Sequence, residues 1–308
     1  MTASEQQSGS RERGAERPQR LVEVRGRTIV VARSAGYCYG VERALQITEQ
    51  AVERSPKPIA TLGPIIHNPS VVERLAERGA AVVEDVAALE RGTVVVRTHG
   101  VPPAVIDEAR RRGLTVVDAT CPFVTVAQRK AAALREAGYA VVILGERDHP
   151  EVVGLSACAG EQAVVVEDPG ELDAAALRGR RVGVVVQTTQ SYGKLARLAE
   201  ALAPLARETL IYNTICEATE QRQEAAREVA AMVDVVLVVG GRNSANTRRL
   251  AALCRELQPR THHIERAAEI DPAWFIGVAR VGITAGASTP DEEIDGAVEA
   301  VAGIIGLA

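Results

Sequence analysis

Aromatic residues are scarce in this chain: they make up 3% of its 308 residues, with only 2 Phe and 1 Trp. So few aromatic side chains are too sparse for a surface on which nucleic-acid bases stack. The net charge of −4, with acidic and basic residues interspersed, gives no basic patch either. No apolar run approaches the ~20 residues that cross a bilayer. We therefore expect no nucleic-acid partner and no membrane span.

Several common motifs are also absent. The chain has no G-x-x-x-x-G-K-[ST], no G-x-G-x-x-G after a predicted strand and no helix-turn-helix signal. Its five cysteines include no close pair such as C-x-x-C, which structural zinc sites usually show. Residues 1–26 lack the apolar core of a secretory signal, and we expect a disordered leader there. We therefore expect the protein to be cytoplasmic, where thiols stay reduced.

Strands and helices alternate from residue 28 to the end. Short β-branched runs predict strands at 28–33, 58–63, 93–98, 114–119, 140–145, 182–187, 208–213, 234–240 and 279–286. Amphipathic stretches between them, such as 41–53, 71–79, 126–138 and 220–233, predict helices. The apolar runs are continuous rather than alternating, which is typical of parallel strands covered on both faces. The fold class is therefore α/β with parallel sheets.

Three cysteines divide the chain into similar thirds. Cys38, Cys121 and Cys216 each follow a predicted strand and precede a predicted helix, and they are 83 and 95 residues apart. This repeat predicts a trefoil of three similar α/β domains around a pseudo-threefold axis. We place the domains at 39–120, 121–215, and 216–300 together with 27–38.

Polar residues repeat at matching places in each third. They lie 28 or 29 residues after each cysteine and again in the loops RTHG, QTTQS and TAGAST. Ligands of open α/β sheets bind beyond the carboxyl ends of strands, so we expect these side chains to share a central cavity with the cysteines. The set is His67, His99, His149, Glu151, Thr188, Thr189, Ser244, Asn246 and Ser288.

The cysteines and these polar residues together suit a site that binds a metal next to an anion. Three convergent thiolates can hold zinc, an iron–sulfur cluster or nothing, and a cubane cluster suits three ligands with one open iron. Neutral donors and histidines suit a phosphate. Glu151 is the one carboxylate, and with a raised pKa it could deliver protons through a threonine hydroxyl. We expect Cys158 and Cys254 to be structural, and His262 and His263 to lie outside the site.

Nine ordered segments resemble one family. They are AGYCYGVERA, GPIIHNP, RTHGV, DATCPFV, HPEVVG, QTTQS, ICEATEQRQ, VVGGRNSANTRRL and TAGASTPD. Together they are similar to the 4-hydroxy-3-methylbut-2-enyl diphosphate reductases of the non-mevalonate isoprenoid pathway, over roughly residues 28 to 300. The resemblance implies a trefoil fold around a central [4Fe–4S] cluster.

The resemblance also implies a reaction, the reductive dehydroxylation of that diphosphate to isopentenyl and dimethylallyl diphosphate. The matching cluster ligands are Cys38, Cys121 and Cys216, with the fourth iron open for the substrate hydroxyl. Glu151 matches the proton source, Thr188 its hydroxyl partner, and His149 a pocket residue that supports orientation and proton supply. The positions matching the diphosphate-binding residues are His67, His99, Ser244, Asn246 and Ser288.

Three features depart from the family pattern: Ala245 where many members have a serine, Tyr39 after the first cysteine, and the leader. Because the chain has no flavin or nicotinamide motif, we expect an external electron donor, a ferredoxin or flavodoxin. Two other interpretations stay open at this point. One is a zinc-bound or cluster-free hydrolase or lyase on the same scaffold, and the other is a cluster-containing sensor that acts through a partner.

Overall fold

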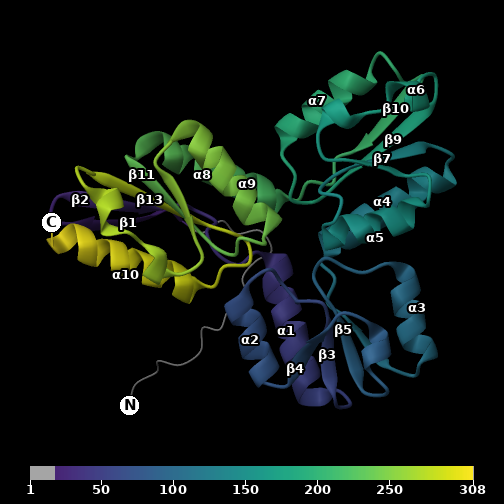
Figure 1. The fold of residues 1–308 in the computed structure, drawn as a ribbon, viewed down its shortest axis with the longest axis horizontal. Helices are drawn as coiled ribbons and strands as arrows, with labels where there is room; N and C mark the ends of the chain where they lie inside the picture. The colour runs from purple at the N-terminus through teal and green to yellow at the C-terminus, as the bar shows by residue number, and fades with distance from the viewer. Residues whose placement is uncertain (1–17, 308) are drawn as a thin grey trace, which may run out of the picture.

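The computed structural model describes residues 18–307, which form three α/β lobes that meet at one point (Figure 1). The first lobe has a four-stranded parallel sheet in the order β4-β3-β5-β6. Its helices and strands in chain order are α1 (Tyr39–Arg54), β3 (Ile59–Leu62), α2 (Pro69–Glu77), β4 (Ala80–Val83), β5 (Thr93–Val96), α3 (Pro103–Arg111) and β6 (Thr115–Asp118).

The second lobe repeats this plan with a parallel sheet in the order β10-β9-β7-β8. Its elements are α4 (Pro122–Glu136), β7 (Ala140–Leu144), α5 (Pro150–Ala159), β8 (Val164–Val166), α6 (Ala174–Leu177), β9 (Arg181–Val186), α7 (Tyr192–Leu202) and β10 (Glu208–Tyr212).

The third lobe combines both ends of the described chain in one sheet, in the order β1-β2-β13-β11-β12. Its elements are β1 (Arg20–Val24), β2 (Arg27–Val31), α8 (Glu217–Met232), β11 (Val235–Val239), α9 (Ala245–Leu257), β12 (Thr261–Ile264), β13 (Arg280–Ala285) and α10 (Asp291–Leu307). Because β2 pairs in parallel with β13, we propose that residues 27–38 and 216–300 form one domain, beside domains at 39–120 and 121–215.

Each sheet is covered on both faces, which explains the continuous apolar runs. Strand β11 shows this: all five of its residues are buried, and they contribute to two separate hydrophobic clusters. Val235, Leu237 and Val239 pack on one face, and Val236 and Val238 pack on the other. The predicted α/β class with parallel sheets is confirmed. None of the helices in residues 18–307 is both long and apolar enough to cross a membrane.

The expected disordered leader at residues 1–26 is wrong for its last part. Residues Arg20–Val24 form β1, which pairs antiparallel with β2, with Arg20 opposite Val31. A tight turn joins the two strands, and both of its residues, Arg25 and Gly26, have positive φ, as two-residue hairpin turns require. Val22 and Val24 pack against the third lobe's core. The remainder of the expected leader, residues 1–17, lies outside the described residues.

Candidate functional site

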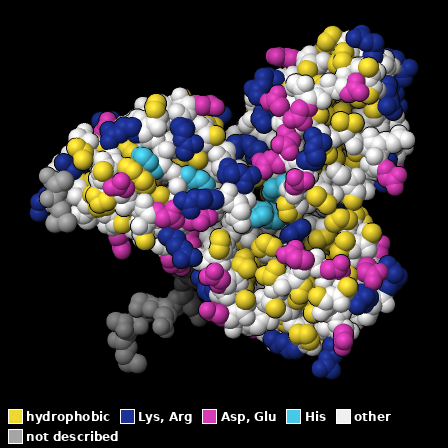
Figure 2. Space-filling view, in the orientation of Figure 1, with side chains coloured by type: hydrophobic (Ala, Val, Ile, Leu, Met, Phe, Trp, Pro, Cys, Tyr) yellow, Lys and Arg dark blue, Asp and Glu magenta, His cyan; other side chains and the backbone are white. Residues whose placement is uncertain are grey.

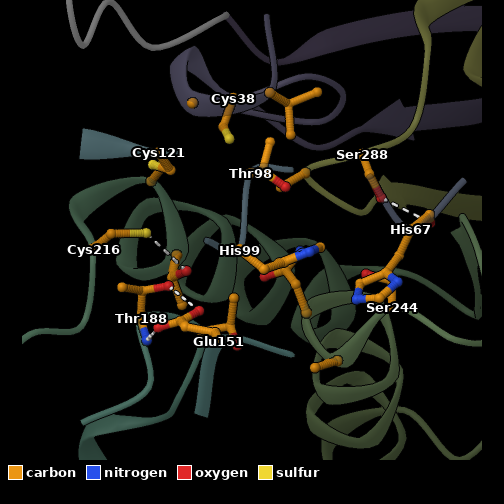
Figure 3. Close-up of a pocket in the computed structure, with 18 of the residues that line it drawn as sticks. Cys38, His67, Thr98, His99, Cys121, Glu151, Thr188, Cys216, Ser244 and Ser288 are labelled. Atoms are coloured by element: carbon orange, nitrogen blue, oxygen red, sulfur yellow. Dashed lines mark hydrogen bonds between the residues drawn. The ribbon is translucent and has the colours of Figure 1, made fainter. Parts of the chain in front are cut away.

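Side chains from all three lobes line one cavity of about 100 Å³ at the point where the lobes meet. Figure 2 shows histidine side chains at this junction. In Figure 3 the three cysteines lie at one end, His67 and two serines lie at the other, and Glu151 and Thr188 lie beside Cys216. Every residue predicted for the site lines this cavity: Cys38, His67, His99, Cys121, His149, Glu151, Thr188, Thr189, Cys216, Ser244, Asn246 and Ser288.

Each of the three cysteines immediately precedes a helix. Cys38, Cys121 and Cys216 are the N-cap residues of α1, α4 and α8, and none of their side chains caps its helix. Gly40 shows how closely two of the sulfurs approach. A Cβ atom there would lie 2.6 Å from the Cys121 Sγ and 3.8 Å from the Cys38 Sγ. Two lobes therefore direct sulfur atoms at the same point, and only glycine leaves room for them.

Burial disfavours the charged form of two of these thiols. It raises the pKa of Cys121 to about 12 and also raises the pKa of Cys216, and neighbouring cysteines add to both shifts. Without a cation beside them, these two sulfurs would carry protons at neutral pH. Because metal-bound cysteine is a thiolate, a bound metal would supply the missing positive charge. Three soft sulfur donors from three rigid helix ends fit a [4Fe–4S] cluster with one iron left without a protein ligand.

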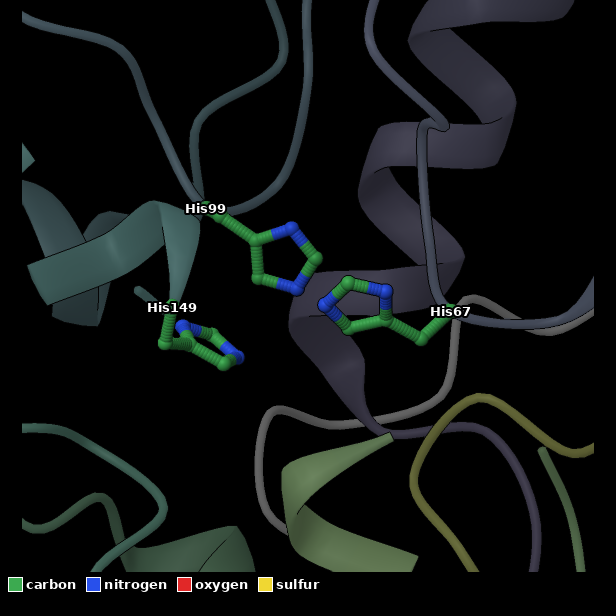
Figure 4. A group of neighbouring side chains, drawn as sticks. All are labelled: His67, His99 and His149. Atoms are coloured by element: carbon green, nitrogen blue, oxygen red, sulfur yellow. The ribbon is translucent and has the colours of Figure 1, made fainter. Parts of the chain in front are cut away.

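Three histidines that line the cavity lie close to one another (Figure 4). The rings of His67 and His99 stack with centroids 4.3 Å apart, and His149 meets them edge-on at 5.4 and 5.2 Å. Ring nitrogens of the three lie within 4.8 Å of one another. Both ring nitrogens of His67 and the Nδ1 of His99 are buried without a hydrogen-bond partner among the described residues. These nitrogens are therefore available to a ligand.

The surroundings of all three rings disfavour their charged forms. Burial is the main cause, and it lowers the pKa of His67 to about 4, that of His149 to about 3, and that of His99 well below its ordinary value. The nearby guanidinium groups of Arg97 and Arg248 add to the lowering for His67 and His149. An anion that entered this part of the cavity would raise the pKa values of the three histidines again, because it would stabilise their charged rings.

The tautomer of His149 distinguishes between two kinds of ligand. The backbone N–H of Glu151 donates to His149 Nδ1 at 3.1 Å, so the neutral ring carries its proton on Nε2. Neither nitrogen of this neutral ring can then bind a metal ion, because Nδ1 already accepts a hydrogen bond and Nε2 carries the proton. His149 therefore favours an anion that accepts a hydrogen bond over a metal ion.

Glu151 and Thr188 form a buried pair. The side chain of Glu151 is 1% exposed and accepts two hydrogen bonds, from the Thr188 N–H at 2.6 Å and the Thr188 Oγ1 at 2.8 Å. Burial raises the pKa of Glu151 to about 7, and the two hydrogen bonds limit the rise. A carboxyl group with this pKa can hold and release a proton near neutral pH.

The third lobe contributes three buried polar side chains. Ser244 is the N-cap of α9 and accepts from the Thr247 N–H at 3.3 Å. Ser288 donates to the backbone oxygen of His67 at 3.2 Å. Asn246 Nδ2 is buried without a partner among the described residues. Ala245, the departure from the family pattern, lies between Ser244 and Asn246 and also lines the cavity.

Sequence reasoning missed several residues of this cavity, among them Thr98, Thr219 and Arg222. Thr219 lies 3.2 Å from the Cys216 sulfur, and Arg222 is 4% exposed. Both belong to the segment ICEATEQRQ, where the helical pattern beginning at residue 217 was the only visible signal. A polar residue three or six positions after a cysteine, on the face that the helix buries, is the signal that could have identified them.

Four residues expected to lie outside the site do not line the cavity. Cys254 is buried in the core of the third lobe, and Cys158 packs against the core of the second. His262 stacks on Trp274 with ring centroids 3.8 Å apart. His263 Nε2 lies 2.8 Å from the Gly240 oxygen.

The chain is similar to known proteins over most of its length. A family model described as LytB protein matches residues 29–302. A protein of Pelobacter propionicus named 4-hydroxy-3-methylbut-2-enyl diphosphate reductase is 50% identical over 267 residues, which cover 87% of this chain and 95% of that protein. A protein of Aquifex aeolicus with the same name is 46% identical, covering 85% of this chain and 92% of that protein.

Two solved structures are similar as well. One is titled as the structure of (E)-4-hydroxy-3-methyl-but-2-enyl diphosphate reductase, the terminal enzyme of the non-mevalonate pathway. It is 43% identical with a TM-score of 0.66, covering 89% of this chain and 98% of that one. The other is the E-1-hydroxy-2-methyl-but-2-enyl-4-diphosphate reductase of Plasmodium falciparum. It is 26% identical with a TM-score of 0.82, covering 88% of this chain and 86% of that one.

Proposed function

This chain belongs to the LytB protein family, and from that membership and the cavity's geometry we propose that it reduces 4-hydroxy-3-methylbut-2-enyl diphosphate. The chain is an oxidoreductase, as its relatives are. The products are isopentenyl diphosphate and dimethylallyl diphosphate. Two electrons and two protons are consumed while the allylic C–O bond breaks, a C–H bond forms and water leaves. One observation carries the proposal: three thiols, a protonatable carboxyl and an anion-binding cluster share one cavity.

The three cysteines hold a [4Fe–4S] cluster in this proposal. Cys38, Cys121 and Cys216 supply one sulfur from the start of each of three helices, and the positive end of each helix favours the thiolate. When bound, the cluster supplies electrons one at a time and a Lewis-acidic iron without a protein ligand.

The other end of the cavity binds the diphosphate. His149 donates from Nε2, while the neutral rings of His67 and His99 and the Asn246 amide offer buried groups without partners among the described residues. Ser244 and Ser288 add hydroxyl groups. The positive charges of Arg97 and Arg248 lie near enough to affect the histidines, and so they also attract a diphosphate. These contacts fix the substrate with its reacting carbon toward the thiols.

Glu151 supplies protons in this proposal. Its carboxyl is about half protonated near pH 7, and Thr188 Oγ1 donates to one of its oxygens. When Glu151 is protonated, the direction of this bond reverses: the carboxyl donates to Thr188 Oγ1, and the threonine hydrogen can turn into the cavity and be passed on. His149 fixes the first turn of α5 through the Glu151 N–H and so positions this carboxyl.

Electrons come from outside the chain. No flavin or nicotinamide motif occurs in the sequence, so we propose an external one-electron carrier, a ferredoxin or flavodoxin. All five cysteines are free thiols, which agrees with a reducing, cytoplasmic location.

An iron count and an absorption spectrum on anaerobically reconstituted protein test this proposal. We expect about four irons per chain and a broad band near 400 nm, which addition of the allylic diphosphate perturbs. Cys121→Ser should lose most of the iron, while Cys158→Ser, outside the cavity, should keep it. A colourless protein that holds zinc or no metal after reconstitution would contradict the reductase and favour a hydrolase.

A further inference from the structure

One of the three thiols differs from the others in its surroundings. Thr219 Oγ1 lies 3.2 Å from the Cys216 Sγ. Within residues 18–307, the sulfurs of Cys38 and Cys121 have no hydroxyl side chain hydrogen-bonded to them. The cluster environment is therefore asymmetric at this one sulfur.

Thr219 is held firmly in place. Its side chain is 4% exposed, and its backbone N–H donates to the Cys216 oxygen at 2.9 Å. Arg222, one turn further along α8, donates to the Gly36 oxygen at 2.6 Å and to the Ala218 oxygen at 2.9 Å. Because Gly36 lies two residues before Cys38, this side chain fixes the start of α8 against the segment that carries another thiol.

The direction of the hydrogen bond follows from chemistry. A metal-bound cysteine is a thiolate and can only accept hydrogen bonds, so the Thr219 hydroxyl must donate. A donated hydrogen bond stabilises negative charge on sulfur. That charge grows when the cluster takes up an electron, and hydrogen bonds to the sulfurs are one of the protein's means of setting a cluster's potential.

We propose that Thr219 is a positioning residue that raises the reduction potential of the cluster through its hydrogen bond to Cys216 Sγ. This inference depends on the cluster assigned above to Cys38, Cys121 and Cys216. The higher potential makes transfer of one electron from the external carrier to the cluster more favourable.

The chain contains a matched control. Thr125 lies in the first turns of α4, four residues after Cys121, but its Oγ1 is directed at the Cys121 backbone oxygen at 3.4 Å and not at the sulfur. Thr125→Val therefore removes a hydroxyl near a cluster cysteine without changing a sulfur contact. Thr219→Ser keeps the hydroxyl that Thr219→Val removes.

The test is a potentiometric titration of each reconstituted variant without substrate, followed by electron paramagnetic resonance of the reduced cluster. Thr219→Val should shift the midpoint potential to a more negative value by up to about 59 mV. This shift corresponds to a tenfold smaller equilibrium constant for one-electron reduction of the cluster. Thr219→Ser and Thr125→Val should keep the native potential.

The possible outcomes separate this inference from the proposed function. A native protein that assembles no cluster contradicts the proposed function itself. A fully loaded Thr219→Val protein with an unchanged potential overturns the role of Thr219 and leaves the reductase intact. An equal shift in Thr125→Val would also overturn it, because the effect would then not depend on the sulfur contact.

Discussion

The buried carboxyl of Glu151 is the residue on which proton transfer depends in the proposed reaction. Glu151→Gln keeps the shape, can accept from the Thr188 N–H and can donate to Thr188 Oγ1, but it has no acidic proton. Because a general acid contributes about 100-fold to 10,000-fold, we expect kcat to fall at least about 100-fold with the cluster and substrate binding retained. Steady-state turnover with reduced methyl viologen measures this. Glu161→Gln, at an exposed position, is the control and should be fully active.

The pKa of the same carboxyl predicts the pH dependence. Burial raises the pKa of Glu151 to about 7, and only the protonated form donates. Activity should therefore be highest below pH 7 and fall as pH rises through about 7. Well above that pH, each further pH unit should lower kcat by close to tenfold. A kcat profile between pH 6 and 9 with reduced methyl viologen tests the sign. A flat profile would remove Glu151 as the titrating donor.

The sequence was informative about single residues where a loop follows a strand. The cysteines and the polar loop residues could be predicted because strand ends in parallel sheets point to one region. Thr219 and Arg222 were not predicted, because their contacts depend on which face of α8 is buried. That face is fixed by the packing of α8 on α9, β11 and β13, which had not been assigned from the sequence.

At the scale of elements, every strand inside a sheet was predicted, and so were the edge strands β6 and β10. All nine predicted strands exist. The four that were missed, β1, β4, β8 and β12, are edge strands of their sheets. The missed strands are only three to five residues long and partly exposed, so each shows at most a short apolar run. In β4, for example, two of four residues are exposed.

The first strand provides a test at this scale. Val22 packs against the core of the third lobe, so Val22→Ala should lower the free energy of unfolding by about 1 kcal/mol. Leu21 is 62% exposed on the same strand, and Leu21→Ala should change it by less than about 0.5 kcal/mol. Chemical denaturation measures both. Equal effects would show that β1 does not contribute to the core.

At the scale of the molecule, one carboxylate joins two lobes beside the cavity. Glu146, after β7, pairs with Arg249 at 3.0 Å and also with Arg248, both on α9. Arg249 further contacts the Thr189 oxygen, and it is only 15% exposed. This partly buried network holds the second lobe against the third.

Glu146→Gln should therefore loosen the second lobe from the third. We expect a larger radius of gyration in small-angle X-ray scattering and about fivefold weaker substrate binding, or ~1 kcal/mol. Glu171→Gln is the control, because its pair with Arg147 lies within the second lobe. Unchanged scattering and affinity in Glu146→Gln would show that other contacts set the arrangement of the lobes.

The pairing of β2 with β13 has a consequence for synthesis on the ribosome. All three cysteines have been added by residue 216, yet β2 has no parallel neighbour until residues 280–285 emerge. The segment leading from β2 to Cys38 must wait for the C-terminal part of the chain, to which the Cys38 N–H is also hydrogen-bonded through Ala287. Contacts so distant in sequence form late. The cage for the proposed cluster can therefore be complete only after residue 287 has been added.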